Sequence, residues 1–322
     1  SFSDEAHFWA HLGRFYSIEM NEHGEAIKAI DKAINLTSHN PDPVLFHMKG
    51  MFYRRIVYKN IEELKTREPA KEEIAQLQGT VESAKEAFAA ARTLDPDSEY
   101  AHISPTQLLL RVLDFGFAVS GQKFRADFLV SPTATWYREQ LDEIEYLLER
   151  VRGIREGDKP SQYVLRCEAE LDEIYDNYSR ALEGWGNLLQ RKDVFAPPIR
   201  RQIVRAYLTR SKREWSSIPQ SEIERTVDLM EDNMREEPKS DYNIRLWFRA
   251  LRYSARQDID AALARLANWK IIGDSLEAHF YLYVLHVLKA IDGSMIERVR
   301  SEELIQQSGV KSRSQRNRTR SF

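Results

Sequence analysis

Large and small side chains near the start of the chain follow a pattern that few folds can accommodate. Large apolar residues recur at i, i+3 and i+7 on one helix face, and the next predicted helix carries small or medium residues: Trp9, Leu12 and Tyr16, then Ala26, Ile30 and Ala33. Gly13 lies on the first face and lets the second helix approach closely. Such a pair cannot bury its apolar faces alone, so the pattern predicts a stack of helix pairs with an exposed groove.

A second, weaker copy of the pattern follows 37 residues later. Its first helix carries Phe46, Gly50 and Tyr53, and its second helix ends in a proline, with Ala84, Phe88, Ala91, Leu94 and Pro96. The spacing is close to the roughly 34 residues of the tetratricopeptide repeat (TPR), which this part of the chain resembles. We therefore expect an all-α, TPR-like α-solenoid with long antiparallel helical hairpin insertions. In the second pair, both helices should extend beyond the stack through 57–81 and join near Glu68 and Pro69.

The strict repeat is then lost, but helical spacing of apolar residues continues. It predicts a helix over 137–151 and one helix of about 30 residues that includes 164–188. The short connector between them favours an antiparallel pair within one chain over an intermolecular coiled coil. Pro197 and Pro198 predict the start of a helix, and Ser221 with Glu224 predicts a capping box for the next one.

These segments predict four parts of the chain. Residues 1–102 hold TPR-like repeats with an extended second pair, 103–192 the long hairpin, and 193–292 irregular TPR-like pairs that include helices over 241–257, 259–272 and 276–291. Trp247 and Trp269 should fill the core. Because 280–288 is apolar around nearly the whole helix axis, and the chain lacks an initiator Met, we expect it to be a piece of a longer polypeptide in which another domain covers this helix. Residues 293–322 would be a basic tail or the start of that truncated domain.

The charge changes abruptly after Gly309. Residues 1–310 hold 42 basic and 50 acidic groups, a net charge of −8, whereas the last segment carries only positive charges: Lys311, Arg313, Arg316, Arg318 and Arg320. This segment has three readings: a nucleic-acid arm, a disordered stub, or a strand of a missing domain. The alternation of charges and the single aromatic residue, Phe322, favour the stub or strand.

Known catalytic and metal-binding patterns are incomplete in the chain. Gly116, Gly121 and Lys123 resemble a phosphate loop, but Phe124 replaces the required Ser or Thr, and a buried helix with its C-terminal turn explains the segment better. His7 and His11 have metal-ligand spacing without a third ligand. We therefore predict no catalytic residues, no metal, no cofactor and no enzymatic activity in this chain.

The cellular context is predicted from cysteine usage and hydropathy. Cys167 is the single cysteine, which excludes a disulfide framework and suits the reducing cytosol, and it lies on an apolar helix face where a buried, inert thiol is expected. No signal peptide is recognisable, and the longest apolar run, 280–291, is too short to span a bilayer. A cytoplasmic protein without membrane contact is expected.

The predicted binding site follows from the helix-pair stack. The first helix of each pair lines the concave face, which assigns the outward positions there to a ligand-binding groove: His7, Arg14, His47, Arg54 and Arg55. Their positive character suits an acidic or carboxylate-bearing protein or peptide.

Several motifs together resemble a known family. The opening TPR pattern, FHMKGMFY at 46–53, YAHISPTQLLL at 100–110 and KSRSQRNRTRSF at 311–322 are similar to the helical segment of STAND-class P-loop ATPases, nearest to bacterial relatives of the antiviral sterile-alpha-motif-domain-containing family. This resemblance implies ATPase and effector domains before Ser1, a small OB-like β domain after the helices, and a sensor role toward a protein of viral origin. The alternative is a nucleic-acid-binding helical repeat that uses the basic tail.

Overall fold

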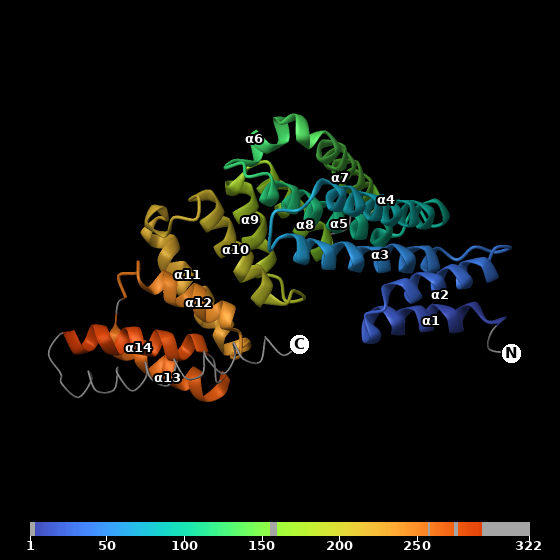
Figure 1. Cartoon of the computed structure of the whole chain (residues 1–322). Coiled ribbons are helices and arrows are strands. Elements are labelled where there is room, and N and C mark those ends of the chain that lie inside the picture. The colour runs from blue at the N-terminus through green and yellow to red at the C-terminus, as the bar shows by residue number, and fades with distance from the viewer. Residues whose placement is uncertain (1–3, 155–159, 257, 274–275, 292–322) are drawn as a thin grey trace. The chain divides into compact units, whose positions relative to one another are not determined.

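A computed structural model describes residues 4–154, 160–256, 258–273 and 276–291, with the backbone alone at 271–273 (Figure 1). All regular elements within these ranges are helices. The chain divides between Gly184 and Trp185, inside helix α9, into two compact units. The predicted all-α solenoid of helix pairs is confirmed.

The first unit is a row of helices in which each packs on the next. α2 contacts α1 and α3, α4 contacts α3 and α5, and α5 also contacts α7 and α8. The elements are α1 (Ala6–Phe15), the π-turn η2 (Tyr16–Met20), α2 (His23–Leu36), α3 (Pro43–Leu64), α4 (Lys71–Leu94), α5 (Glu99–Val119), α6 (Arg125–Val130), η3 (Pro132–Ala134), α7 (Thr135–Ile154), α8 (Gln162–Ile174) and α9 (Tyr178–Leu189). The extended pair α3/α4 is confirmed, and Glu68 and Pro69 lie in its connection.

Glycines set the approach of the two helices within each pair. A Cβ atom at Gly50 would lie 2.6 Å from the ring of Phe88, and one at Gly116 would lie 2.3 Å from the ring of Tyr137. At Gly13 it would lie 3.1 Å from a carbonyl oxygen of α2. The glycine contact predicted from the first repeat therefore recurs in the third pair, α5 with α7, where inserted α6 hides the repeat from the sequence pattern.

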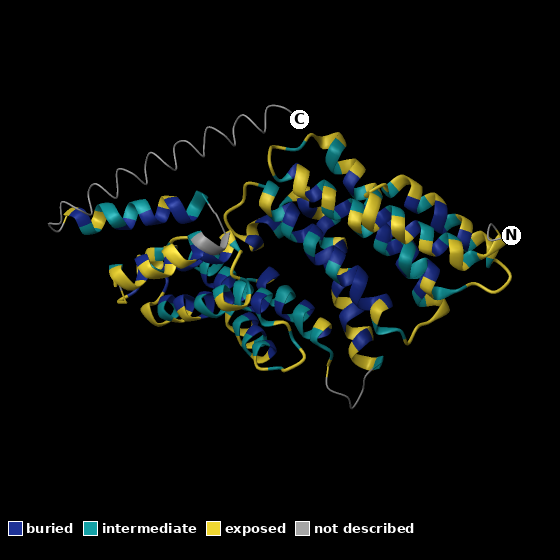
Figure 2. Ribbon diagram, turned by 90° about the horizontal axis from the view of Figure 1, so that it is seen from below, coloured by how far each residue is buried: buried dark blue, intermediate teal, exposed yellow. Residues whose placement is uncertain are grey.

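The core of the first unit is shared by all its long helices. One buried cluster extends through α3, α4, α5, α7 and α8, and a smaller one joins α1, α2 and the start of α3. Figure 2 shows the buried residues on the sides where helices meet and exposed residues on the outer sides. Helix α5 is the most deeply buried of these helices: its buried residues run from Ala101 to Gly116 with few interruptions.

Pro105 lies inside α5 and would leave a backbone carbonyl without its helical donor. Proline lacks the N–H that would bond to the carbonyl of Ala101. Arg92 of α4 donates from Nη1 to that oxygen at 3.2 Å. Burial lowers the pKa of this guanidinium. Arg92 thus replaces the missing backbone bond and ties α4 to α5.

The single long helix predicted over 164–188 is wrong. α8 ends at Ile174 and α9 begins at Tyr178, because Asp176 takes the left-handed region at φ 56° and the Asn177 N–H donates to the Asp172 carbonyl at 2.8 Å. The chain reverses there: a Cβ at Gly184 would lie 3.2 Å from Cβ of Ala169. The predicted hairpin of 137–151 with 164–188 is also wrong, because α7 packs chiefly on α5.

The second unit continues as shorter helices. They are the end of α9, α10 (Ala196–Arg210), η4 (Trp215–Ser217), α11 (Gln220–Glu236), α12 (Asp241–Leu251), α13 (Ile259–Gly273) and α14 (Leu276–Ile291). α11 packs on α10 and α12, and α14 packs on α13 and α12. Pro197 and Pro198 lie in the first turn of α10, as predicted. Trp247 and Trp269 are buried, which confirms them as core residues.

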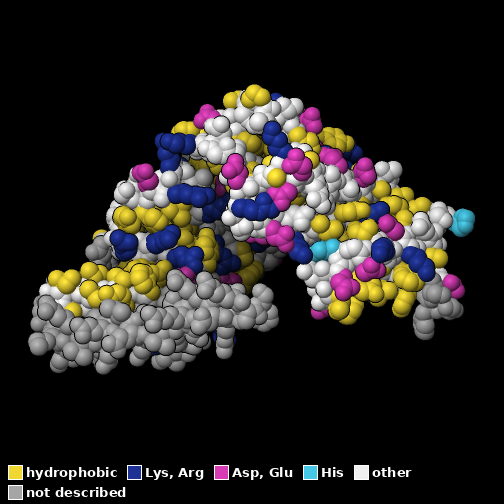
Figure 3. Space-filling view, in the orientation of Figure 1, with side chains coloured by type: hydrophobic (Ala, Val, Ile, Leu, Met, Phe, Trp, Pro, Cys, Tyr) yellow, Lys and Arg dark blue, Asp and Glu magenta, His cyan; other side chains and the backbone are white. Residues whose placement is uncertain are grey.

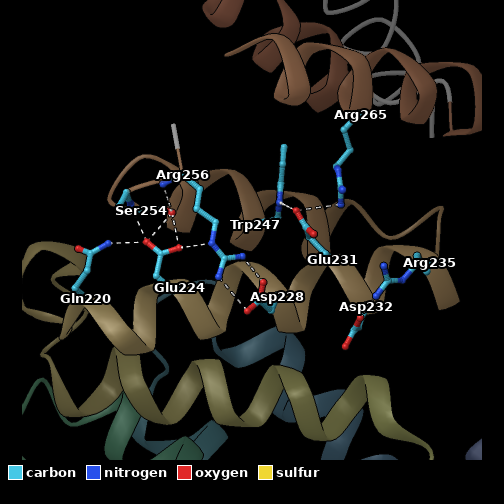
Figure 4. Close-up of polar contacts among 11 residues, drawn as sticks. Gln220, Glu224, Asp228, Glu231, Asp232, Arg235, Trp247, Ser254, Arg256 and Arg265 are labelled. Carbon is cyan, nitrogen blue, oxygen red and sulfur yellow. Dashed lines mark hydrogen bonds and ion pairs between the residues drawn. The ribbon is translucent and has the colours of Figure 1, made fainter. Parts of the chain in front are cut away.

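The capping box predicted for Ser221 and Glu224 is wrong. No side chain caps α11, which begins at Gln220. The Glu224 carboxylate instead accepts hydrogen bonds from Ser254 Oγ at 2.8 Å and from the Ala255 N–H at 2.7 Å (Figure 4). Burial opposes ionisation of Glu224, but these hydrogen bonds lower its pKa.

Glu224 begins an acidic row along α11 that binds the next helices. Figure 4 shows Arg256 reaching both Glu224, with Nε 2.8 Å from Oε2, and Asp228. One turn further, Glu231 accepts from Trp247 Nε1 at 3.3 Å and pairs with Arg265 Nη1 at 3.2 Å. The row therefore fastens α12, α13 and their connection to α11.

None of the described helices combines the length and the hydropathy that a membrane span requires.

Substitution of Gly50 by Ala should destabilise the first unit. The new methyl group would overlap the ring of Phe88, which is fully buried and cannot move aside, so we expect a loss of about 1–3 kcal/mol in the free energy of unfolding. Gly79→Ala in α4 is the matched control, because its Cβ would meet open space and should stabilise by about 0.5–1 kcal/mol. Urea unfolding measures both, and equal stability of the two variants would contradict the glycine contact.

Candidate functional site

Helix α5 exposes a narrow polar face on an otherwise buried surface. Between Leu108 and Gly116 the positions that are not buried are 111 and 114, and 107 precedes them at the same helical spacing. The residues there are Gln107, Arg111 and Asp114, all half-buried. Asp114 is engaged by Arg125 at 2.7 Å, which leaves the first two to face α3.

Side chains from α3 meet this face in register. Arg54 donates from Nη1 to Gln107 Oε1 at 2.9 Å, and the Tyr58 hydroxyl donates to the Gln107 carbonyl at 3.3 Å. One turn further, Arg111 pairs with Glu62. These five residues, spaced four apart on each helix, are called the α3–α5 ridge below.

Helix α8 also packs against α5 and adds an acid to the ridge's surroundings. Burial is the main cause of a raised pKa for the Tyr58 hydroxyl, and the nearby Arg54 lowers that pKa while Glu170 of α8 raises it. Tyr58 is therefore a neutral hydrogen-bond donor. Burial also raises the pKa of Cys167 well above its ordinary value, so this buried thiol is protonated and unreactive, as predicted.

The ridge can bind carboxylates. A guanidinium has five N–H donors. Arg54 gives one to Gln107 and holds its Cζ 5.6 Å from the Tyr58 ring centre, and Arg111 pairs with one carboxylate, so both retain donors. Because both side chains are half-buried, their hydrogen bonds to a carboxylate are less weakened by water than those of exposed arginines.

The predicted groove residues occupy different surroundings. Arg54 is part of the ridge, and Arg55 is exposed beside it on α3. His7 and Arg14 are exposed on α1, where the His7 ring meets the His11 ring edge-on with centroids 4.9 Å apart. Within the described residues, no hydrogen bond, ion pair or ring contact joins His7 or Arg14 to α3. Ligand binding by these residues stays a prediction.

His47 packs inward from α3. Its Nε2 lies 3.0 Å from Ser104 Oγ on α5, and its ring centre lies 5.5 Å from that of Phe88 on α4. Burial, and secondarily the charge of Arg54, lower its pKa. His47 of α3 therefore contacts both α4 and α5. Its role in ligand binding stays a prediction.

The other predicted features are the basic segment, the phosphate-loop-like segment and the metal-ligand spacing. Lys311, Arg313, Arg316, Arg318 and Arg320 lie outside the described residues. α5 ends at Val119 and Gly121 follows at φ 70°, which confirms a helix with its C-terminal turn at the phosphate-loop-like segment. Among the described residues, no cluster of three or more His, Cys, Asp or Glu could hold a metal ion.

Sequence reasoning missed Tyr58, Gln107, Arg111 and Glu170. A signal for two of them was present: positions 107 and 111 are polar in a run of apolar residues and are spaced one helical turn apart. Tyr58 follows Arg54 at the same spacing. Their convergence depends on the register of α3 against α5, which the sequence pattern does not define.

Comparison with known proteins gives likenesses of fold alone. No protein-family model matches the chain, and no curated protein matches it in sequence. Similar solved structures include a TPR protein of Thermus thermophilus (11% identity, 76% of this chain and 98% of that chain, TM-score 0.49) and a tetratricopeptide repeat protein of Parabacteroides merdae (12%, 87% and 98%, TM-score 0.31). An IFIT1 variant with m7Gppp-AAAA is a more distant match (17%, 94% and 80%, TM-score 0.22).

The position of His47 predicts a pH-dependent contribution to stability. Its folded pKa is lowered, so the unfolded chain binds the proton more readily. The stability that neutral His47 supports is present above its unfolded pKa of about 6.5 and is lost as the pH falls through the folded pKa. The difference in unfolding free energy between the parent chain and His47→Gln should therefore shrink as the pH decreases below about 6.5. Urea unfolding at several pH values tests this, and a difference that is constant with pH would contradict it.

Proposed function

We propose that this chain is a non-catalytic protein-interaction scaffold whose α3–α5 ridge binds an extended acidic segment of a partner protein. The proposal rests on Arg54 and Arg111, which are half-buried on neighbouring helices. Each of them keeps N–H donors that its contact within the chain does not use. Gln107 and Tyr58 hold the two helices in register beneath them.

The spacing of the helices favours an extended ligand with acids three residues apart. Packed helix axes lie about 8–10 Å apart. An extended polyproline II segment has three residues per turn and rises about 3.1 Å per residue, so carboxylates at i and i+3 lie on the same side, about 9 Å apart. Such a segment can place one carboxylate at Arg54 and the next at Arg111, with Arg55 at the exposed edge. His7 and Arg14 would extend the positive surface along α1.

Substitution of the ridge arginines should weaken this binding. The probe is a labelled peptide with Glu at i and i+3, and its matched control carries Gln at both positions. Arg54→Glu and Arg111→Gln should each weaken binding by about tenfold to a hundredfold, since a hydrogen bond to a charged group contributes about 1.5–3 kcal/mol. Arg55→Glu, at the edge, should weaken it less. Arg180→Glu on α9 is the control variant, because this arginine is 73% exposed and outside the ridge.

Fluorescence anisotropy with the full chain measures these affinities, and circular dichroism checks that each variant is folded. Equal affinity for the Glu and Gln peptides, or undiminished binding by Arg54→Glu and Arg111→Gln, would contradict the proposed site.

The resemblance to STAND-class ATPases supports a finer context for the scaffold. In it, the ligand is a protein of viral origin, the compartment is the cytosol, and binding releases an ATPase elsewhere in the same polypeptide. A lysate of infected cells should then stimulate ATP hydrolysis by the complete polypeptide, whereas an uninfected lysate should not. Arg54→Glu should remove the response, and equal rates with the two lysates would argue against this context.

The basic segment favours a second candidate function, nucleic-acid binding. Lys311, Arg313, Arg316, Arg318 and Arg320 carry positive charge, whereas residues 1–310 have a net charge of −8 and should repel phosphate. If the segment binds RNA or DNA, filter binding should show an affinity that falls steeply with salt and disappears when 311–322 is deleted. Affinity that persists after the deletion would contradict this mechanism.

A further inference from the structure

An apolar groove runs between α12 and α14 in the second unit. Its volume is about 650 Å³, and its lining combines apolar residues of both helices with the first turn of α13. The lining includes Phe248, Phe280, Tyr281, Val284, Leu288 and Arg249. Figure 3 shows hydrophobic side chains gathered over α14, with Lys and Arg side chains on the side of α12. This groove is in a different unit from the α3–α5 ridge and does not depend on it.

The floor of the groove is preformed. Phe248 of α12 stacks on Tyr281 of α14 with ring centroids 4.2 Å apart and planes at 17°. Both side chains are buried. Arg245 of α12 donates from Nε to both oxygens of Glu277 on α14, at 3.1 and 3.2 Å. The two helices are therefore held together by an aromatic stack and by a forked ion pair.

The wall of the groove on α14 is an apolar stripe. Phe280, Val284 and Leu288 follow at steps of four and so lie on one helix face. Phe280 is 55% exposed and Leu288 is 46% exposed. A stripe of large apolar side chains that remains open beside a preformed groove is typical of a surface that binds another apolar face.

The opposite rim carries positive charge. Arg249 and Arg252 of α12 are exposed and line the groove. Among the described residues, Arg249 has no carboxylate partner. The acidic lining residue, Asp258, is occupied by α13: its Oδ1 accepts from the N–H groups of Asp260 and Ala261, each at 3.0 Å. The groove therefore presents an apolar wall and a cationic rim.

We propose that this groove binds an amphipathic helix of a partner protein that carries carboxylates along one flank. The apolar face would pack on Phe280, Val284 and Leu288, and an acidic residue would lie beside Arg249. A helix suits the groove because it satisfies its own backbone hydrogen bonds, whereas the helical walls have few free backbone groups for an extended strand. Apolar anchors at i, i+3, i+4 and i+7 would match the stripe.

The test uses two synthetic helical peptides with the same Leu spacing. One has Glu along the flank and the other has Lys, and each is labelled for fluorescence anisotropy with the full chain. The Glu peptide should bind at least about tenfold more tightly than the Lys peptide, and Leu288→Glu should weaken it by a similar factor. Arg249→Glu should reverse the preference between the peptides, while Arg180→Glu should leave it unchanged.

Three results would overturn the proposal. The first is absence of binding by the Glu peptide, or a preference that Arg249→Glu does not change. The second is a dimer in sedimentation that Leu288→Glu dissociates, which would assign the groove to a second copy of the chain. The third is a gain of more than about tenfold in Glu-peptide affinity when 292–322 is deleted, which would assign the groove to the chain's own following segment.

Discussion

The close approach of helices at glycine is the contact on which the first unit depends. Phe88 and Tyr137 each fill the space that a Cβ atom would take at Gly50 and Gly116. Since the aromatic ring fits only against bare backbone, these contacts set both the separation of the two helices and their rotation about their axes. The same rotation turns Arg54 and Tyr58 of α3 toward α5, so the polar ridge is a consequence of the packing beneath it.

The interior of α5 shows how such a stack can bury a helix almost completely. Burial of the helix on several sides requires every backbone group to be satisfied, and Pro105 removes one donor. Arg92 supplies the replacement from the neighbouring helix, with its pKa lowered by burial. With the backbone satisfied and most side chains apolar, the few polar positions of α5 stand out. Gln107 and Arg111 contact α3, and Asp114 holds Arg125.

Much of the fold could be predicted because helix pairs are local. The spacing of Trp9, Gly13 and Tyr16 and the proline at 69 are sufficient to predict the early pairs and the extended α3/α4. The break near Asp176 was missed because apolar spacing continues across a tight turn, so periodicity alone cannot distinguish one helix from two. Glu224 was misassigned because its partners Ser254 and Ala255 are distant in sequence.

The ridge also depends on contacts between distant residues, so Arg54 was predicted from its own helix while Gln107 and Arg111 were not. The four predicted parts, with boundaries at 102, 192 and 292, stay predictions.

The salt dependence of binding distinguishes the two proposed kinds of ligand, an acidic protein segment and a nucleic acid. The net charge of the body is −8 through residue 310, and its effect on an acidic ligand is largely screened beyond a Debye length of about 8 Å at physiological salt. That body repels acids and phosphates alike, so recognition of an acid must arise at short range, from half-buried arginines whose interactions salt screens only weakly. Nucleic acid bound through an exposed basic segment has the opposite dependence, because its affinity comes from counterion release and falls as salt rises. Weak salt dependence therefore identifies binding at the ridge, and a steep decline identifies binding through the segment after Gly309.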